Sequence, residues 1–271
     1  MKISNIISRR NRILLRELVV TDFKLRYQGS VLGYLWSLLK PLFMFAILYV
    51  VFGHFLRVGD TVEHFSVYLL LGIVCWTFFT EATNQGLASI VDHGDLIRKI
   101  NFPKYIIVIA GSLSALINLV LNLAIIAVFI VLNVVDMHAS ALLFPLYILE
   151  LYVFSLSLAF FLSAAFVRYR DVSHIWEVLL QGVFYATPIL YPLTLVTKEA
   201  GNTVAQLLMM NPIAQIIQDA RHALITPQTL TLGDLTSNIF IQIIPFLIVV
   251  VFALFASYYF KKHSAYFSEN V

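Results

Sequence analysis

The chain has 271 residues, of which 60% are hydrophobic and 12% are charged, and its formal net charge is +3. A water-soluble domain of this composition would have a mostly apolar surface, so the composition excludes a soluble fold and indicates a protein that lies in a lipid bilayer. The small net charge gives no indication of nucleic-acid binding. Cys75 is the single cysteine, which excludes an intrachain disulfide and a cysteine-based metal site.

The N-terminal segment is strongly basic, with seven Lys and Arg residues but only two acidic residues between Met1 and Arg26. A short segment with this charge is expected to stay in the cytoplasm. Its first dozen residues contain no apolar signal-peptide region, so we expect the first membrane span to be retained. We predict that residues 1–34 form a cytoplasmic arm, with an interfacial helix over 13–27 and a bend at 29–33.

Six apolar runs are each long enough for a helix of about 20 residues to cross a bilayer. These runs cover residues 36–56, 65–82, 105–135, 139–167, 172–190 and 239–260. They are continuous rather than alternating, which excludes transmembrane β-strands. The sequence therefore predicts an all-α integral membrane protein with six transmembrane helices and both termini in the cytoplasm. This topology leaves only Arg57, Lys198 and Arg221 outside, out of 18 Lys and Arg residues.

Two connecting segments are predicted to contain short helices. On the cytoplasmic side, residues 84–104 include two Asp residues followed by Arg98 and Lys99, and Pro103 ends any helix there. On the outer side, residues 191–238 contain Asn211-Pro212, which is typical of a helix N-cap followed by proline at the first helical position.

The helix after Asn211-Pro212 is predicted to be amphipathic, with an apolar face opposite a polar one. The polar face carries Gln215, Gln218, Asp219 and His222. Together with residues 203–210, this helix is expected to form a re-entrant hairpin that dips into the outer leaflet before the sixth span. The alternative is an ordinary folded outer loop.

Three carboxylates, those of Glu81, Glu150 and Glu177, are expected within the membrane, where charged groups are costly and usually functional. Asn118 and Asn122 lie four residues apart on one helix face, so we expect interhelical hydrogen bonds from them at the depth of Glu150. No intramembrane Lys, Arg or Asp is expected to pair with these carboxylates. The sequence therefore disfavours an ion-coupled transporter, and Glu150 is interpreted as a protonated or hydrogen-bonded packing residue.

Aromatic residues make up 14% of the chain, and not all of them can be anchors at the membrane interface. Aromatic faces offer apolar stacking surface, with a polar group on Tyr, so an aromatic wall would let a sugar chain slide past without tight binding. The alternative is that these residues only pack helices together. The candidate channel-lining residues are Tyr49, Phe52, Phe184, Tyr185 and Tyr191.

The sequence has no phosphate-binding loop of the form G-x-x-x-x-G-K-[ST], no H-E-x-x-H pair and no G-x-S-x-G turn. We therefore predict that the chain is not an enzyme and has no cofactor of its own. Uphill transport would take its energy from an ion gradient or from another polypeptide on the cytoplasmic face.

Residues 26–41, RYQGSVLGYLWSLLKP, resemble the signature R-Y-x-x-S-x-L-G-x-x-W-x-x-x-x-P of the permease subunits of type-2 ABC exporters for polysaccharides, which include O-antigen, capsule and teichoic acid transporters. Further matches follow in chain order: F-P at 102–103, R-Y-R-D-V at 168–172, P-I-L-Y-P at 188–192 and N-P-x-x-x-I-I-x-x-x-R at 211–221. They extend over essentially the whole chain, so the resemblance implies a single transmembrane domain over residues 1–271.

The resemblance implies a homodimer in the inner membrane, with a translocation channel at its interface and two copies of a separate ATPase subunit that binds ATP and Mg²⁺. The implied substrate is a polysaccharide on a polyprenyl diphosphate lipid. Residues 84–104 would be the coupling loop, and residues 191–238 would surround the outer exit. The implied ATPase-coupling residues are Asp95, Arg98, Lys99, Phe102, Arg168 and Arg170. The implied substrate entry and gate residues are Arg26, Tyr27, Tyr34 and Lys40.

The sequence leaves two alternatives open. One is an exporter of drugs or small lipids with the same fold. The other, from a different class, is an integral-membrane enzyme that acts on polyprenyl-linked sugars. Such an enzyme should show Asp, His or Arg residues clustered at one membrane face, and the sequence has no such cluster.

Overall fold

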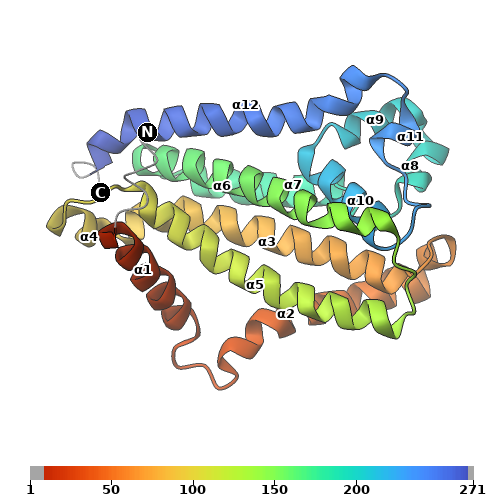
Figure 1. Ribbon diagram of the computed structural model, residues 1–271, viewed down its shortest axis with the longest axis horizontal. Helices are drawn as coiled ribbons and strands as arrows, with labels where there is room; N and C mark the ends of the chain where they lie inside the picture. Colours follow the sequence, from red (N-terminus) through yellow and green to blue (C-terminus); the bar gives the residue numbers. More distant parts are fainter. Residues whose placement is uncertain (1–8, 268–271) are drawn as a thin grey trace.

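The computed structural model describes residues 9–267, and over this range the regular structure consists of helices alone (Figure 1). Five helical segments are long and apolar enough to cross a membrane: Gly33–Phe55, Phe65–Asp92, Tyr105–Leu132, Ala139–Arg168 and Ile239–Tyr266. The predicted all-α membrane fold is confirmed, and the chain is a multi-pass membrane protein.

The helices of the bundle and its N-terminal arm are α1 (Arg9–Tyr27), α2 (Trp36–Leu48), α3 (Phe65–Asp92), α5 (Tyr105–Leu132), α6 (Phe144–Arg168), α7 (Val172–Ala186) and α12 (Ile239–His263). The helices of the connecting segments are α4 (Gly94–Lys99), α8 (Leu193–Ala200), α9 (Asn202–Met209), α10 (Pro212–Leu224) and α11 (Leu232–Leu235). A π-helical segment, Tyr49–Phe55, continues α2.

Helix α7 occupies the fifth predicted span, residues 172–190, but it has only 15 residues. At 1.5 Å per residue it is about 22 Å long, whereas the hydrocarbon core of a bilayer is about 30 Å thick. The helix ends because Thr187 precedes Pro188 and adopts an extended backbone, as residues before proline tend to do. The count of six spans therefore stays a prediction for this segment.

Helix α3 is longer than the sequence predicted, since it continues past residue 82 to Asp92. Polar residues are frequent in this part of the helix, beginning with Glu81. In the structure Glu81, Asn84 and Gln85 lie on one face of the helix, while Leu87 and Ile90 continue the buried face. The first part of the predicted coupling loop, residues 84–92, is therefore helix, and α4 follows it as the expected short helix.

Helix α3 forms the centre of the bundle, and 72% of an apolar 18-residue stretch of this helix is buried. It packs between α5 and α6. Where α3 crosses α6, a Cβ atom on Gly86 would lie only 2.2 Å from the Cβ of Ala159. Small residues thus bring the two backbones together, a common basis of helix packing in membranes.

Different helices lie at the two ends of the bundle. Helix α1, helix α4 and the C-terminal end of α12 gather at one end, and the short helices α8 to α11 gather at the other (Figure 1). The bend predicted at 29–33 joins α1 to the first span, and Gly29 and Gly33 there have φ values of +76° and +51°. Glycine adopts such values without steric cost.

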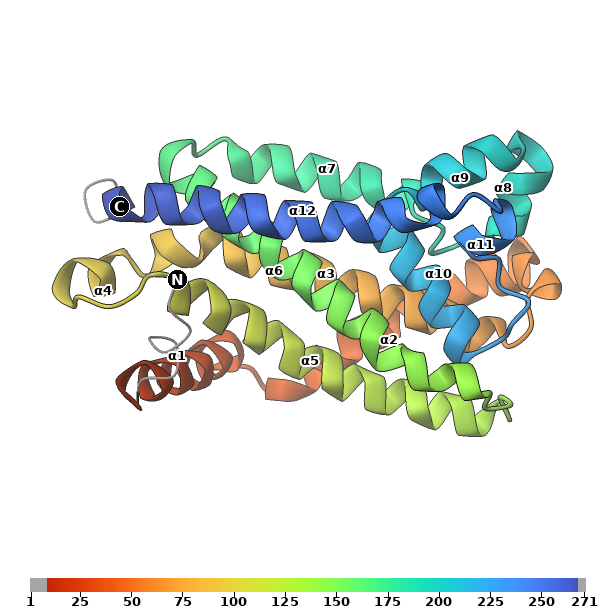
Figure 2. The same ribbon diagram turned by 45° about the horizontal axis from the view of Figure 1, so that its top comes forward.

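Helix α10 confirms the predicted start signal, because the Asn211 side chain accepts a hydrogen bond from the backbone N–H of Ile213 at 3.2 Å. Its predicted polar face is largely buried against protein: Gln215 is 8% exposed and Gln218 is 0% exposed. Helix α10 packs against α3, α6 and α12, as Figure 2 shows from the side. The segment before it forms two helices, α8 and α9, that pack on each other.

Candidate functional site: a groove between α2 and α7

A groove of about 980 Å³ runs along the bundle and is lined by α2, α3, α5 and α7, together with Arg26 of α1. Its polar lining includes Arg26, Lys40, Glu81, Asn84, Gln85, Asn118, Asn122, Glu177 and Gln181. Its aromatic lining comprises Trp36, Trp76, Phe78, Phe184 and Tyr185. The groove thus combines charged groups with aromatic rings inside a membrane bundle.

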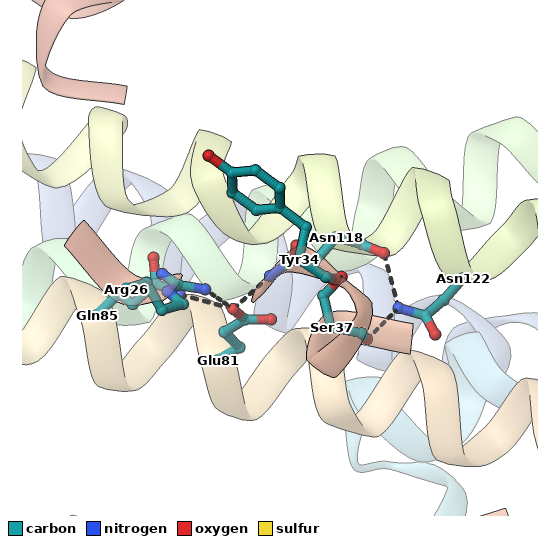
Figure 3. A network of polar contacts seen from close by, with 7 residues as sticks. All are labelled: Arg26, Tyr34, Ser37, Glu81, Gln85, Asn118 and Asn122. Carbon is teal, nitrogen blue, oxygen red and sulfur yellow. Dashed lines mark hydrogen bonds and ion pairs between the residues drawn. The ribbon is translucent and has the colours of Figure 1, made fainter. Parts of the chain in front are cut away.

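Glu81 lies at the centre of a polar network in this groove (Figure 3). Its Oε1 atom forms an ion pair with Arg26 and accepts hydrogen bonds from Asn118 Nδ2 at 2.7 Å and Gln85 Nε2 at 3.0 Å. The side chains of Arg26 and Glu81 are 26% and 22% exposed. One carboxylate therefore ties α1 to α3 and α5 while both charged groups still reach the groove.

Asn122 extends the network toward α2. Its Nδ2 donates to the backbone oxygens of Ser37 at 3.1 Å and Asn118 at 2.8 Å. The Ser37 hydroxyl in turn donates to the backbone oxygen of Tyr34 at 2.7 Å. The chain entering the first span is thus held against α5 by hydrogen bonds.

The predicted interhelical hydrogen bonds of Asn118 and Asn122 are confirmed, and their depth relative to Glu150 stays a prediction. Asn118 bonds to Glu81, whereas Glu150 lines a different cavity. The expectation that no Lys, Arg or Asp within the membrane pairs with these carboxylates is not contradicted, because the partner of Glu81 comes from outside the spans. Arg26 reaches Glu81 from α1, which lies outside the five spans and folds back against the bundle.

The predicted entry residues are placed differently from one another. Arg26 and Lys40 both line the groove. The Tyr34 ring stacks on Phe23, with 4.9 Å between ring centroids, and points away from Glu81 in Figure 3. Tyr27 ends α1, and its side chain lies outside the described part of the structure.

Two of the five candidate channel aromatics, Phe184 and Tyr185, lie in the groove wall. The Phe184 ring contacts Trp76, with 5.4 Å between centroids. The other three, Tyr49, Phe52 and Tyr191, lie outside the groove lining: the first two belong to the π-helical segment after α2, and the Tyr191 hydroxyl donates to the backbone oxygen of Tyr185 at 3.0 Å. Their role in lining a channel stays a prediction.

The predicted coupling residues gather at the end of the bundle that holds α1 (Figures 1 and 2). On α4, Arg98 and Asp95 are exposed and 3.7 Å apart, and Lys99 is exposed beside them. Phe102 is 5% exposed, packed in the core that holds α4 against the bundle. The remaining two residues, Arg168 and Arg170, are exposed at the turn between α6 and α7.

Sequence reasoning missed several groove residues, among them Asn84, Gln85 and Gln181. The signal for the α3 members was present: Thr77, Thr80, Glu81, Asn84 and Gln85 recur at spacings of three or four in an otherwise apolar helix. That spacing places them on one face.

The groove is not arranged as a metal centre. Within residues 9–267, no three His, Cys, Asp or Glu side chains are grouped so that they can hold a metal ion. The groups present are suited instead to a ligand with both anionic and apolar parts, because Arg26 and Lys40 attract negative charge and the aromatic rings provide stacking surface.

The comparisons with known proteins agree with this architecture. Residues 13–225 match the ABC-2 type transporter family, and the chain belongs to this family. It is 31% identical over 206 residues to the O-antigen export system permease protein RfbA of Myxococcus xanthus, covering 76% of this chain and 78% of that protein. It is 26% identical over 197 residues to the RfbA protein of Klebsiella pneumoniae, covering 72% and 74% of the two chains.

A more distant relative is the polysialic acid transport protein KpsM of Escherichia coli, 22% identical over 220 residues that cover 78% of this chain and 81% of that protein. The resemblance found in the sequence motifs is thus confirmed. The chain is a membrane-embedded permease subunit, and its family implies an ATPase partner.

Proposed function

We propose that this permease moves a polysaccharide carried on a polyprenyl diphosphate lipid from the cytoplasmic to the outer face of the inner membrane. The names of the relatives in three organisms support a polysaccharide as the substrate class. The energy comes from ATP bound with Mg²⁺ to the separate ATPase subunit.

The observation that carries this proposal is the pairing of basic and aromatic groups in one groove of about 980 Å³. A diphosphate is recognised by charge-assisted hydrogen bonds from groups such as Arg26 and Lys40. Sugar rings are recognised by stacking on aromatic faces, which the tryptophans and Tyr185 provide. Because Glu81 already neutralises Arg26, an entering diphosphate competes with that carboxylate, which keeps binding weak enough for release.

The assembly proposed is a homodimer in which the groove of one copy faces that of the other. Helices α2 and α7, which border the groove, expose large apolar side chains: Ile47 is 62% exposed, Val178 69% and Tyr185 69%. A second copy packed against these helices would close the two grooves into one channel. Helices α8 to α10 would then surround its outer end as re-entrant elements.

The orientation proposed places α1 and α4 in the cytoplasm, since short basic segments are retained there. The exposed pair Arg98 and Lys99 on α4 would then face the ATPase. With one ATPase beneath each permease copy, motion driven by ATP would pass through α4 into α3.

Two double variants test the assignment. Arg98→Ala with Lys99→Ala should abolish polysaccharide export and weaken co-purification of the ATPase, while membrane insertion is retained. Arg26→Gln with Lys40→Gln should leave co-purification intact but remove the stimulation of ATP hydrolysis by the lipid-linked polysaccharide. Both are measured in cells and in reconstituted vesicles, with exposed Lys198→Gln at the other end of the bundle as the matched control.

Two results would contradict the proposal. One is unchanged export by both double variants. The other is uphill transport by the permease alone, reconstituted without the ATPase and driven by a proton or sodium gradient.

A further inference from the structure

A second cavity, of about 850 Å³, lies between α6, α10 and α12. Among the described residues it shares no lining side chain with the groove between α2 and α7. Its walls carry two carboxylates, Glu150 from α6 and Asp219 from α10, and the proposed transport path uses neither of them.

Gln215 of α10 lies beside these carboxylates. Its Nε2 donates to Asp219 Oδ2 at 2.6 Å, and the side chain belongs to a residue that is only 8% exposed. The Oε1 atoms of Gln215 and Glu150 are both buried and have no hydrogen-bond partner within residues 9–267. Buried oxygen acceptors without a donor are costly, and these two line the same cavity.

The two carboxylates in this cavity are not balanced by an ion-pair partner among the described residues. Neither Glu150 nor Asp219 takes part in any of the ion pairs in the described part of the chain. The basic side chain among the described lining residues is His222, whose Nδ1 lies 2.9 Å from the backbone oxygen of Thr229. A carbonyl oxygen only accepts, so Nδ1 carries the proton, and a neutral ring then leaves Nε2 as a further acceptor.

We propose that this cavity binds a partly hydrated divalent cation of the Mg²⁺ and Ca²⁺ class, which links α6 to α10 through Glu150, Asp219 and the amide oxygen of Gln215. Carboxylate and amide oxygens are the ligands of these hard cations. The cation supplies the positive charge that two partly buried carboxylates otherwise lack.

The arrangement favours an ion that retains water. The direct ligands that the cavity offers are two carboxylates and one amide oxygen, and no third His, Cys, Asp or Glu side chain of the described residues completes a metal-binding group with them. Mg²⁺ often binds in this way, through one or two carboxylates with several waters kept. A cavity of about 850 Å³ has room for that water shell.

The test uses the purified full chain in lipid nanodiscs, stripped of metal and free of nucleotide. Tb³⁺ luminescence excited through tyrosine reports binding, because Tyr147 lines the cavity. MgCl₂ and CaCl₂ should displace Tb³⁺ and raise the unfolding temperature, whereas KCl and ethanolamine hydrochloride at equal ionic strength should do neither. Tyr147→Phe, which removes no carboxylate, should lower the luminescence.

The ligand variants are Glu150→Gln and Asp219→Asn. Each should weaken Tb³⁺ and Mg²⁺ binding by at least about tenfold, the scale on which loss of a supporting group acts at metal sites. Glu199→Gln, which removes one exposed carboxylate from α8, is the matched control and should bind as the unmodified chain does.

Several outcomes overturn the proposal. They are equal Mg²⁺ binding by Glu150→Gln and Glu199→Gln, no displacement of Tb³⁺ by MgCl₂ or CaCl₂, or an equal effect of ethanolamine, which would indicate an ammonium site. If the two ligand variants do not fold, the unmodified chain and Tyr147→Phe still decide the question, since unchanged luminescence in Tyr147→Phe places the bound ion elsewhere.

Discussion

Arg26 and Arg221 are two arginines in one membrane bundle that are held in opposite ways. Arg26 is 26% exposed in its side chain and pairs with the carboxylate of Glu81 at the groove. Arg221 is 0% exposed, and no ion pair of the described residues includes it. It donates instead to the backbone oxygens of Tyr68 at 3.0 Å, Pro188 at 2.6 Å and Ile189 at 2.8 Å.

The partners decide what each arginine does. A carboxylate is a single mobile group that another anion can replace, and the proposed transport of an anionic lipid relies on such an exchange at Arg26. Backbone carbonyls are fixed parts of the main chain, so Arg221 holds the break after α7, at Pro188 and Ile189, against α3 and α10. The Tyr68 ring, 3.5 Å from the guanidinium carbon, adds a cation–π contact that further stabilises the buried charge.

The largest expected difference in stability is between the variant that removes Arg221 and the variant that removes Arg26. Arg221→Met leaves the buried carbonyls of Pro188 and Ile189, which lie outside the helices, without a donor, at about 1 to 3 kcal/mol for each unsatisfied group, so we expect little folded protein. Arg26→Met leaves Glu81 still accepting from two amides beside the groove, so we expect a loss of about 1 kcal/mol or less. Unfolding temperature and limited proteolysis in detergent measure both.

Lys198→Met, at an exposed position of α8, controls for the loss of a positive charge. The comparison fails if Arg221→Met and Arg26→Met lower the unfolding temperature equally. Arg221→Lys refines it, because an ammonium keeps the charge but cannot reproduce three donors in the planar guanidinium geometry.

A smaller effect is expected at Gly72, which makes room for Arg221. A Cβ atom there would lie 2.3 Å from Nη2 of Arg221, so Gly72→Ala displaces the guanidinium and should destabilise the fold by about 1 to 3 kcal/mol. Gly182 of α7 has no described atom within 4 Å of its ideal Cβ position. Gly182→Ala should therefore be neutral or stabilise by up to about 1 kcal/mol. Thermal unfolding of the two variants, side by side, gives the answer, and equal destabilisation would refute the role assigned to the Gly72 contact.

The smallest expected effect concerns pH at the α1 end. His93 Nε2 lies 3.4 Å from Asp22 of α1, and Nδ1 lies 2.9 Å from the backbone oxygen of Ser89. Both neighbours accept, so only the protonated ring donates to both. The hydrogen bond to Asp22 raises the pKa of His93 above 6.5, against the opposing effect of burial. Its stabilising contribution is complete below pH 6.5 and is lost as pH rises through the raised pKa.

Proteolytic protection of α1, measured from about pH 6 to about pH 8.5, should therefore fall by an amount equivalent to less than about 1 kcal/mol. His93→Gln should remove this dependence on pH. Proteolytic protection around Arg221 should not change over this pH range, because the contact between His93 and Asp22 lies at the α1 end. A fall of equal size in both regions would mean that the pH effect is global.

Much of the fold follows from local sequence patterns. The long apolar runs predicted five spans that the structure contains, and Asn211-Pro212 predicted the start of α10. The short helix before Pro103 was predicted from Arg98 and Lys99 and is present as α4. These features depend on residues that are close together in the sequence, so the local sequence is sufficient to predict them.

The polar contacts of the site were predicted much less well. Arg26 and Glu81 are 55 residues apart, and Arg221 and Tyr68 are 153 apart. The sequence interpreted Arg26 only as a basic group near the membrane entry and Arg221 only as an outer residue. Neither interpretation named the partner, because an apolar helix satisfies its hydropathy equally well at several rotations and depths.

The sequence by itself determined that this chain spans a membrane as helices, because a bilayer offers no hydrogen-bond partners and only a helix satisfies its backbone within one segment. The basic character of its ends was likewise fixed by composition. The tertiary structure alone decided which buried polar groups meet, how α1 folds back onto α5, and that α10 lies inside the bundle. Those outcomes depend on packing between distant segments, and close packing selects one rotation and depth among the several that hydropathy allows.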